Sequence, residues 1–361
     1  MKRVLHFKSL IICMIMALPF CIYATTENKW KNEKSKTIKK EFSVSPNATL
    51  KIDNSYGNLN IVTGTGNKIV FEVTIIASGS NDDKIMDKLN DVDVSFSASK
   101  ELVSARTQFN KGNSNSWWGG KNKINIKVNY LVKIPITNHV DLKNDYGNIN
   151  LEKLEGNAKI DCDYGKITTM ELMGNNDLKF DYSKGCFFEY VKNGKINADY
   201  SEFTISKANS INLNADYTNA NFENLDELIY NGDYGKIEVE KAQRIVGNGD
   251  YLTVLIGDLS KEATLKSDYG AIKIDRITEN AKSITISSDY TGIKLGYGSN
   301  TSFQLHANLS YCNLKDEGDL VITKETKDSG DKSYKGYYGN SNSTNQITIK
   351  SDYGNVTLFK N

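Results

Sequence analysis

Proline is nearly absent from this chain of 361 residues, and histidine and cysteine are scarce. The sequence contains three prolines, three histidines and five cysteines. Lysine and arginine total 45 and aspartate and glutamate total 44, so the formal net charge is only +1. This balance gives no long-range field for attracting nucleic acid or an anionic membrane, so nucleic acid is not an expected partner. The residues that are abundant, 27 glycines and 20 tyrosines, are typical of turns and strands.

After the first 24 residues, no apolar run is long enough to cross a bilayer. Lys2, Arg3 and Lys8 precede an apolar stretch over residues 10–23, and the small residue Ala24 follows it. This order is typical of a secretory signal peptide, so residues 1–24 are predicted to be removed on export. The mature chain is then exported to the periplasm, or to the cell surface in association with the outer membrane, and has no transmembrane segment.

Cys162, Cys186 and Cys312 remain once the signal peptide is removed. An odd number of cysteines without a Cys-x-x-Cys spacing supports neither a disulfide framework nor a zinc site. We therefore expect three buried, unpaired thiols.

One short motif, Asp-Tyr, returns ten times at nearly constant spacing. With the Ser-Tyr variants at Tyr56 and Tyr311 included, the steps from the first Asp-Tyr pair are 18, 18, 18, 17, 17, 17, 18, 21, 21 and 42 residues. The ten pairs are Asp145 and Tyr146, Asp163 and Tyr164, Asp181 and Tyr182, Asp199 and Tyr200, Asp216 and Tyr217, Asp233 and Tyr234, Asp250 and Tyr251, Asp268 and Tyr269, Asp289 and Tyr290, and Asp352 and Tyr353. A fixed period of this length indicates a repeat architecture.

Apolar and polar residues alternate on both sides of each motif, as Val140 and Leu142 do before the first tyrosine. A period of two indicates strands, and the phase breaks just after tyrosine, where glycine often follows and can supply a positive φ or a tight corner. One unit cannot bury its apolar face alone, whereas units stacked about 4.8 Å apart share a continuous core. The sequence therefore predicts an all-β chain with a single-chain β-solenoid of about 18-residue coils over residues 140–361.

Residues 25–139 follow a different pattern and are predicted to form an N-terminal β-rich module. Within it, residues 81–91 carry apolar residues at helical spacing behind Asn81 or Asp82 as a cap, which predicts one short helix. The module is expected to cover the end of the stack, because an uncovered end exposes strand edges. Residues 324–345, rich in Lys, Ser, Gly, Asn and Tyr, account for the 42-residue step and are predicted to be a loop insertion in place of a coil.

The repeated tyrosines and aspartates allow more than one role. Tyrosine shares the phase of the inward apolar residues, which favours a core or corner ladder of stacked rings; the alternative is an exposed aromatic strip for sugar or peptide. Carboxylates about 4.8 Å apart repel by roughly 0.9 kcal/mol even in water, and backbone N–H groups at the turn are the expected offset. A column of calcium ions is the alternative, but the glycine-rich nonapeptide of such sites is absent. No metal or cofactor is predicted.

Catalysis has little support in the sequence, and no catalytic residue is assigned. His6 lies in the signal peptide, His139 and His306 stand alone, and no hydrolase, zinc-protease or phosphate-loop motif is present. A regular aspartate column gives equivalent groups instead of an acid and base pair with different pKa values. Trp117 and Trp118, in a Gly-, Ser- and Asn-rich loop, are the candidate binding contact, unless one of them folds back onto the module.

These features resemble a known family, the exported "β-strand-repeat, putative adhesin" proteins of Bacteroidota, which are related to head GIN-type domains. The resemblance rests on the signal peptide, the opening Phe42-Ser-Val-Ser-Pro followed by Leu50-Lys-Ile-Asp-Asn-Ser-Tyr-Gly-Asn-Leu, the Trp-Trp-Gly loop and the repeated Asp-Tyr-Gly-x-Ile. It implies a β-helical fold, an envelope location and a surface or adhesion role, and it carries no catalytic residues.

The predicted function is that of a non-enzymatic, exported cell-envelope protein. An adhesin-like β-helical scaffold would present a repetitive surface to a glycan or an envelope protein. Two alternatives remain open at this stage, an envelope sensor or regulatory partner protein and a glycan-active β-helix enzyme.

Overall fold

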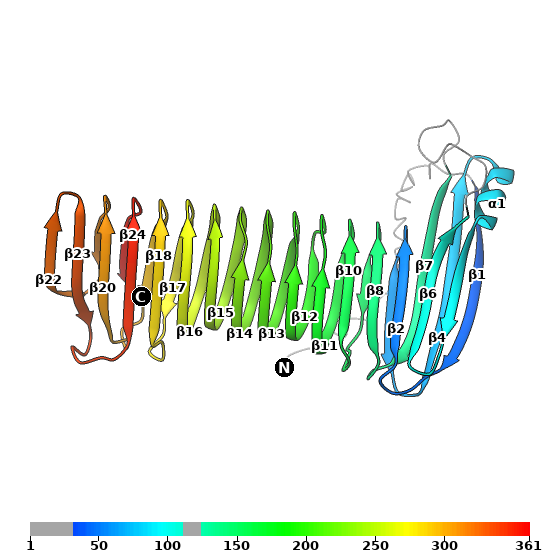
Figure 1. Ribbon diagram of the computed structural model, residues 1–361, viewed down its shortest axis with the longest axis horizontal. Helices are drawn as coiled ribbons and strands as arrows, with labels where there is room; N and C mark the ends of the chain where they lie inside the picture. Colours follow the sequence, from blue (N-terminus) through cyan, green and yellow to red (C-terminus); the bar gives the residue numbers. More distant parts are fainter. Residues whose placement is uncertain (1–31, 111–123) are drawn as a thin grey trace, which may run out of the picture.

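The computed structural model describes residues 32–110 and 124–361. Within these ranges the chain is all-β with one helix, so the predicted fold class is confirmed at that level. The strands form one mixed sheet drawn out along a single axis (Figure 1). Among these residues no helix has the length and apolar character that crossing a membrane requires. The predicted signal peptide and the loop with Trp117 and Trp118 lie outside the described residues.

The repeats build the middle of the sheet, in which each strand pairs in parallel with the strand one repeat later. Equivalent positions face each other, as Val140 faces Ala158 and Ile205 faces Phe222. The strands are β8 (His139–Asp145), β9 (Ile149–Leu151), β10 (Ala158–Asp163), β11 (Ile167–Lys179), β12 (Cys186–Asn197), β13 (Glu202–Asn214), β14 (Thr218–Asn231), β15 (Gly235–Asp250), β16 (Leu252–Asp268), β17 (Ala271–Ile277), β18 (Ser283–Asp289) and β19 (Gly292–Tyr297).

Long strands such as β16 pair with two shorter strands of the next repeat. The first half of β16 pairs with β17 and its second half pairs with β18. The period-two pattern points every second side chain inward, as Phe203, Ile205, Ile211 and Leu213 of β13 show. These side chains belong to one continuous apolar core that runs through the stacked repeats. Each fully buried side chain of this size stabilises the fold by about 1.5–3 kcal/mol. The three cysteines are buried and unpaired, as predicted.

The N-terminal strands extend the same sheet and close one end of it. They are β1 (Asn32–Ser43), β2 (Thr49–Ser55), β3 (Leu59–Gly64), β4 (Lys68–Gly79), β5 (Val92–Ala98), β6 (Leu102–Phe109) and β7 (Asn125–Pro135). β2 pairs in parallel with β8 and β6, and β3 pairs in parallel with β9 and β7, so these strands continue the stack. β4 and β5 then add antiparallel strands to β7 and β6, and β1 adds one to β4.

The predicted helix is found as α1 (Asp82–Asn90). The side chain of Asn81 accepts a hydrogen bond of 3.0 Å from the Lys84 N–H, which caps the helix as its sequence indicates. Ile85 and Leu89 are buried, and the helix lies at the end of the sheet beside β1 and β4 (Figure 1).

At the other end, the repeats are not stacked in chain order. The strands there are β20 (Phe303–Ser310), β21 (Leu314–Glu317), β22 (Val321–Asp328), β23 (Asp331–Tyr338), β24 (Gln346–Asp352) and β25 (Val356–Lys360). β24 lies between β18 and β20, and β25 lies between β19 and β21. The last repeat of the sequence is thus inserted into the stack, and the preceding repeat becomes the outermost one.

The prediction of a loop over residues 324–345 is wrong for most of that range. β22 and β23 form an antiparallel hairpin, and β23 pairs with β20 (Figure 1). Ser329 and Gly330 form the two-residue turn with φ of 48° and 112°, and two positive φ values match the turn type preferred in tight hairpins. Every residue of β22 is exposed, so the segment lacks the alternation of buried and exposed residues that strands such as β13 show.

Candidate binding strip of tyrosines and aspartates

Twelve tyrosines form one continuous stack along a corner of the sheet, here called the tyrosine ladder. Neighbouring ring centroids lie 4.8–5.4 Å apart, and the ring planes are within 9° of parallel. The spatial order is Tyr56, Tyr146, Tyr164, Tyr182, Tyr200, Tyr217, Tyr234, Tyr251, Tyr269, Tyr290, Tyr353 and Tyr311. Each stacked pair adds about 0.5–1.5 kcal/mol beyond the burial of its area.

Every tyrosine of the ladder has a left-handed backbone, with φ between 50° and 63°. This conformation costs a residue with a side chain roughly 1–2 kcal/mol. The sequence suggested that the glycine after tyrosine provides the turn, but the tyrosine itself carries it. The glycine is needed for a different reason, because a Cβ at Gly147 would lie 1.8 Å from the carbonyl oxygen of Gly57. At Gly147 the two neighbouring units therefore approach too closely for a side chain.

The rings are stacked and exposed at the same time. Eleven of the twelve tyrosines, all except Tyr56, are 42–64% exposed, so the phase argument for an inward position is wrong. The left-handed turn directs each ring outward from the corner, where its faces meet only the rings above and below. The edge of Phe109 meets Tyr56 at one end of the ladder, with a centroid distance of 6.0 Å. The strip therefore offers ring edges and phenol groups to a ligand instead of open aromatic faces.

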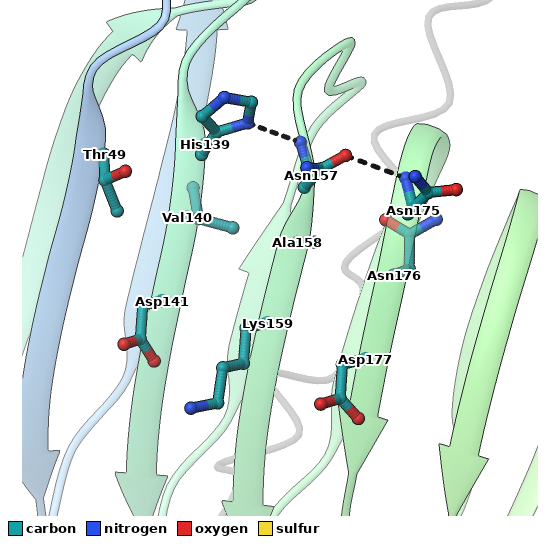
Figure 2. Close-up of a pocket in the computed structure, with 10 residues that line it drawn as sticks. All are labelled: Thr49, His139, Val140, Asp141, Asn157, Ala158, Lys159, Asn175, Asn176 and Asp177. Carbon is teal, nitrogen blue, oxygen red and sulfur yellow. Dashed lines mark hydrogen bonds between the residues drawn. The ribbon is translucent and has the colours of Figure 1, made fainter.

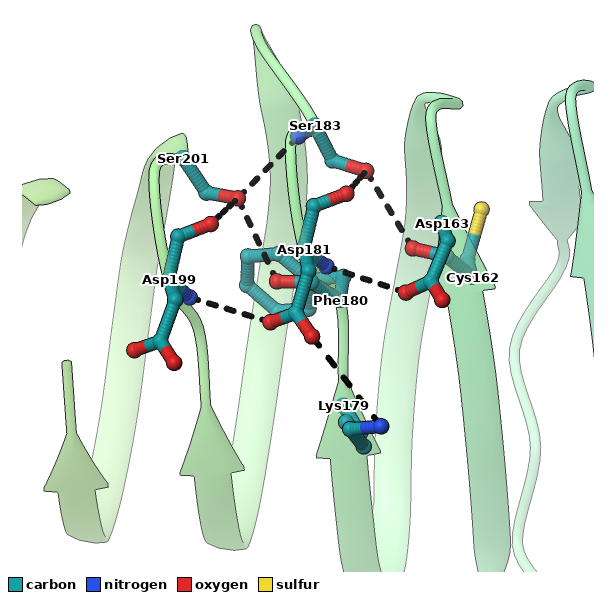
Figure 3. Close-up of polar contacts among 8 residues, drawn as sticks. All are labelled: Cys162, Asp163, Lys179, Phe180, Asp181, Ser183, Asp199 and Ser201. Carbon is teal, nitrogen blue, oxygen red and sulfur yellow. Dashed lines mark hydrogen bonds and ion pairs between the residues drawn. The ribbon is translucent and has the colours of Figure 1, made fainter. Parts of the chain in front are cut away.

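The aspartates that precede the tyrosines form a second column, here called the aspartate column. The N–H of Asp199 donates to Oδ1 of Asp181 at 3.1 Å (Figure 3). The N–H of Asp216 donates to Oδ1 of Asp199 at 3.0 Å. Four further pairs, Asp181 with Asp163, Asp233 with Asp216, Asp250 with Asp233 and Asp289 with Asp268, repeat this bond at 2.8–3.3 Å. Backbone N–H groups thus offset the charge repulsion as predicted, but they belong to the next unit instead of the same turn.

Several units carry a buried hydroxyl where others carry glycine. Ser183 donates to the carbonyl oxygen of Cys162 at 3.2 Å, and Ser201 donates to that of Phe180 at 3.2 Å (Figure 3). Thr218 does the same to Ala198 at 2.8 Å. Each hydroxyl is buried and satisfied by backbone, which ties one unit to the preceding one. These residues were missed in the sequence, although their position directly after tyrosine is a usable signal.

Burial raises the pKa values of two carboxyl groups in the aspartate column, Asp145 and Asp181. For Asp181, the N–H of Asp199 and the ammonium of Lys179, 4.0 Å away, act in the opposite direction without cancelling the burial effect. A raised folded-state pKa means that folding favours the protonated form. The stability that this contributes is complete below the unfolded pKa and is lost as pH rises through the folded pKa.

Because folding raises the pKa of Asp181, the ionised form of this carboxyl group lowers stability at neutral pH. Asp181→Asn keeps an oxygen that accepts the Asp199 N–H and removes a charge, so at neutral pH it is expected to match or exceed the stability of the natural protein. Asp181→Ala leaves that N–H without its acceptor and is expected to lower the free energy of unfolding by about 1 kcal/mol. Urea unfolding measures both. The advantage of Asp181→Asn should shrink as pH falls from about 7 to about 4, and an advantage that grows instead contradicts the assignment.

The other residues considered in the sequence do not join this strip. Nδ1 of His139 accepts a hydrogen bond of 2.8 Å from the Asn157 N–H, and His306 lies outward on β20. In the described part of the chain, no three His, Cys, Asp or Glu side chains gather closely enough to hold a metal ion. Trp117 and Trp118 lie in the segment that is not described, so their role stays a prediction.

Comparison with known proteins gives only distant likenesses. No protein-family model matches the chain, and a search of the curated proteins finds no match. A "putative adhesin" structure from Parabacteroides merdae is 13% identical, with 72% of this chain and 96% of that chain covered and a TM-score of 0.33. A "putative adhesin" from Bacteroides fragilis is 8% identical, with coverages of 90% and 97% and a TM-score of 0.27.

A "putative cell adhesion protein" from Clostridium sporogenes is 10% identical, with coverages of 90% and 100% and a TM-score of 0.17. At such identities and scores, none of these likenesses bears on function. The relation to head GIN-type domains stays a prediction.

Proposed function

We propose that the protein is a non-enzymatic, exported cell-envelope scaffold, adhesin-like in role, whose tyrosine ladder and aspartate column bind an extended glycan or protein. The parallel, in-register pairing of successive repeats supports a β-solenoid over residues 140–361, with residues 25–139 as its N-terminal module. Export rests on the predicted signal peptide over residues 1–24.

The left-handed backbone of the ladder is the observation that carries the proposal. A corner at φ near +55° is filled most easily by glycine or asparagine, yet tyrosine occupies it twelve times. Stacking offsets this strain, but stacking would not by itself require rings that are about half exposed. Strained backbone positions cluster at functional sites, and here they hold a row of phenol groups toward solvent.

The dimensions of the strip suit an extended polymer. Eleven steps of 4.8–5.4 Å make a row roughly 55 Å long, at the spacing of adjacent strands. Small molecules are instead bound in concave sites, which a row of exposed ring edges does not form. A repeating ligand can contact many equivalent phenol and carboxylate groups, so weak individual contacts add up through multivalency.

The test keeps the stack and removes its hydroxyl groups. A triple variant with Tyr200→Phe, Tyr217→Phe and Tyr234→Phe retains ring contacts, and its thermal midpoint is expected to stay unchanged. Binding on a glycan array, or to proteins of the envelope fraction, is expected to fall about tenfold or more, since each hydrogen bond contributes about 0.5–1.5 kcal/mol.

Tyr190→Phe is the matched control, because Tyr190 lies outside the ladder and its hydroxyl is 3.1 Å from Oδ1 of Asn209. The proposal fails if the triple variant binds every partner as the natural protein does. Release of reducing sugar from any glycan that binds would instead favour a glycan-active enzyme.

A further inference from the structure

A shallow hollow lies on the outer face of β8, β10 and β11 (Figure 2). Its volume is about 350 Å³, which is within the size range of small-ligand sites. His139 begins β8 and lies seven residues before Tyr146, which directly follows that strand, so His139 is roughly 23 Å from the ladder. The strip and the hollow are therefore separate surfaces.

A row of fixed hydrogen-bonding groups forms one side of the hollow. The N–H of Asn157 donates to Nδ1 of His139 at 2.8 Å, and the N–H of Asn175 donates to Oδ1 of Asn157 at 2.9 Å (Figure 2). A neutral imidazole that accepts at Nδ1 carries its proton on Nε2, so His139 presents a donor. The amide nitrogen of Asn157 is a second donor, and both side chains are held in place by backbone.

A row of alternating charge forms the other side. Asp141 pairs in register with Lys159, which pairs in register with Asp177, so acceptor, donor and acceptor follow one another across three strands. Lys51 lies 3.1 Å from Asp141 at the edge of the hollow. Within residues 32–110 and 124–361, neither Lys159 nor Asp177 makes an ion pair within 4.0 Å, although both are exposed. Their hydrogen-bonding capacity is therefore available to a ligand.

An unfilled acceptor lies beneath these groups. Asn176 is 5% exposed, and its amide nitrogen donates to the carbonyl oxygens of Gly174 and Asn193 at 3.0 and 2.9 Å. Its Oδ1 accepts no hydrogen bond from the described residues and is buried, so it belongs to the interior of the stack and not to the surface that a ligand in the hollow would meet.

We propose that this hollow is a binding site for one or two units of a neutral saccharide. The charged row alternates in sign, because Lys51 pairs with Asp141 and Lys159 lies between Asp141 and Asp177, so it carries no excess charge that would favour an ion of either sign. A sugar hydroxyl both donates and accepts, so vicinal hydroxyl groups match the alternating donors and acceptors of the two rows. The hollow has no aromatic lining, so recognition depends on hydrogen bonds and single-site affinity is weak.

Calorimetric titration of the mature protein with cellotriose, chitotriose and maltotriose tests the proposal, with inorganic phosphate as the anionic probe. At least one trisaccharide is expected to bind, and phosphate is not. The double variant Lys159→Ala and Asp177→Ala is expected to weaken that binding about tenfold. Lys195→Ala is the matched control, since Lys195 is the next charge of the same row but does not line the hollow, and it should change binding less than about twofold.

Three results would overturn the saccharide site: no trisaccharide binds, phosphate binds in its place, or the double variant binds as tightly as Lys195→Ala. The ladder triple variant separates this inference from the proposed function. Trisaccharide binding that survives loss of the ladder hydroxyls, but not loss of Lys159 and Asp177, assigns the ligand to the hollow.

Discussion

Gly147→Ala is expected to lower the free energy of unfolding by about 3 kcal/mol or more. The new Cβ would lie 1.8 Å from the carbonyl oxygen of Gly57 and 2.6 Å from its carbonyl carbon. Both atoms belong to the backbone of the adjacent unit, so no flexible side chain can move aside. The methyl group can be accommodated only by separating two units, which breaks parallel hydrogen bonds and part of the stack at Tyr56 and Tyr146. Urea unfolding followed by circular dichroism measures the loss.

Gly292→Ala is the matched control for this prediction. Gly292 begins β19, no atom lies within 4 Å of a Cβ built there, and its φ is not in the left-handed range. Alanine there should be neutral or stabilise by up to about 1 kcal/mol, because it restricts the unfolded chain. Equal stability of the two variants would mean that units do not approach each other as closely as the structure has them.

The stacking of repeats could be predicted because two independent patterns agree. Period-two alternation around Val140 and Leu142 indicated strands, and the constant step between tyrosines indicated units of equal length. The left-handed backbone at tyrosine could not be predicted, since glycine follows six of the twelve ladder tyrosines and is the residue normally associated with positive φ. The glycine is explained only by the backbone of the adjacent unit, which lies 90 residues earlier in the sequence for Gly147 and 18 residues earlier for Gly165.

The spatial order of the last repeats also could not be predicted from the sequence pattern. Leu305 of β20 and Ile347 of β24 face each other at equivalent positions of two units with the same alternation, so periodicity cannot tell which unit is outermost. The hairpin of β22 and β23 settles that order, because it occupies the free edge of β20. The two strands of the hairpin show little alternation of buried and exposed residues, so the Ser-Gly turn was their one signal in the sequence.

The hollow was missed because its parts are far apart in the sequence. His139, Asn157 and Asn175 follow one another at steps of 18 residues and become neighbours only through parallel pairing. Comparing side chains at the same position of successive repeats would have found them, since each stands seven residues before its tyrosine. The aspartate column was visible in the sequence, because one motif contains it. Its hydrogen-bond donors were assigned to the wrong unit, since the sequence does not show how closely units approach.

Tyr217→Ala is expected to lower the free energy of unfolding by about 1–3 kcal/mol. Tyr217 lies 4.8 Å from Tyr200 on one side and 4.8 Å from Tyr234 on the other, so the change removes two stacked contacts of about 0.5–1.5 kcal/mol each. Alanine does not relieve the strain of the left-handed backbone, because it also carries a Cβ at a φ of 53°. The loss should appear in urea unfolding as a lower midpoint with an unchanged slope.

Two further variants at the same position separate the contribution of ring stacking from the cost of the left-handed backbone. Tyr217→Phe retains both stacked contacts and should match the natural protein within about 0.5 kcal/mol, since the phenol hydroxyl faces solvent. Tyr217→Gly loses the ring but relieves the left-handed strain, so it should be more stable than Tyr217→Ala by about 1 kcal/mol. If alanine unfolds at the same midpoint as phenylalanine, the ladder does not hold the units together. Its strained tyrosines would then have no structural role, and binding would be their remaining explanation.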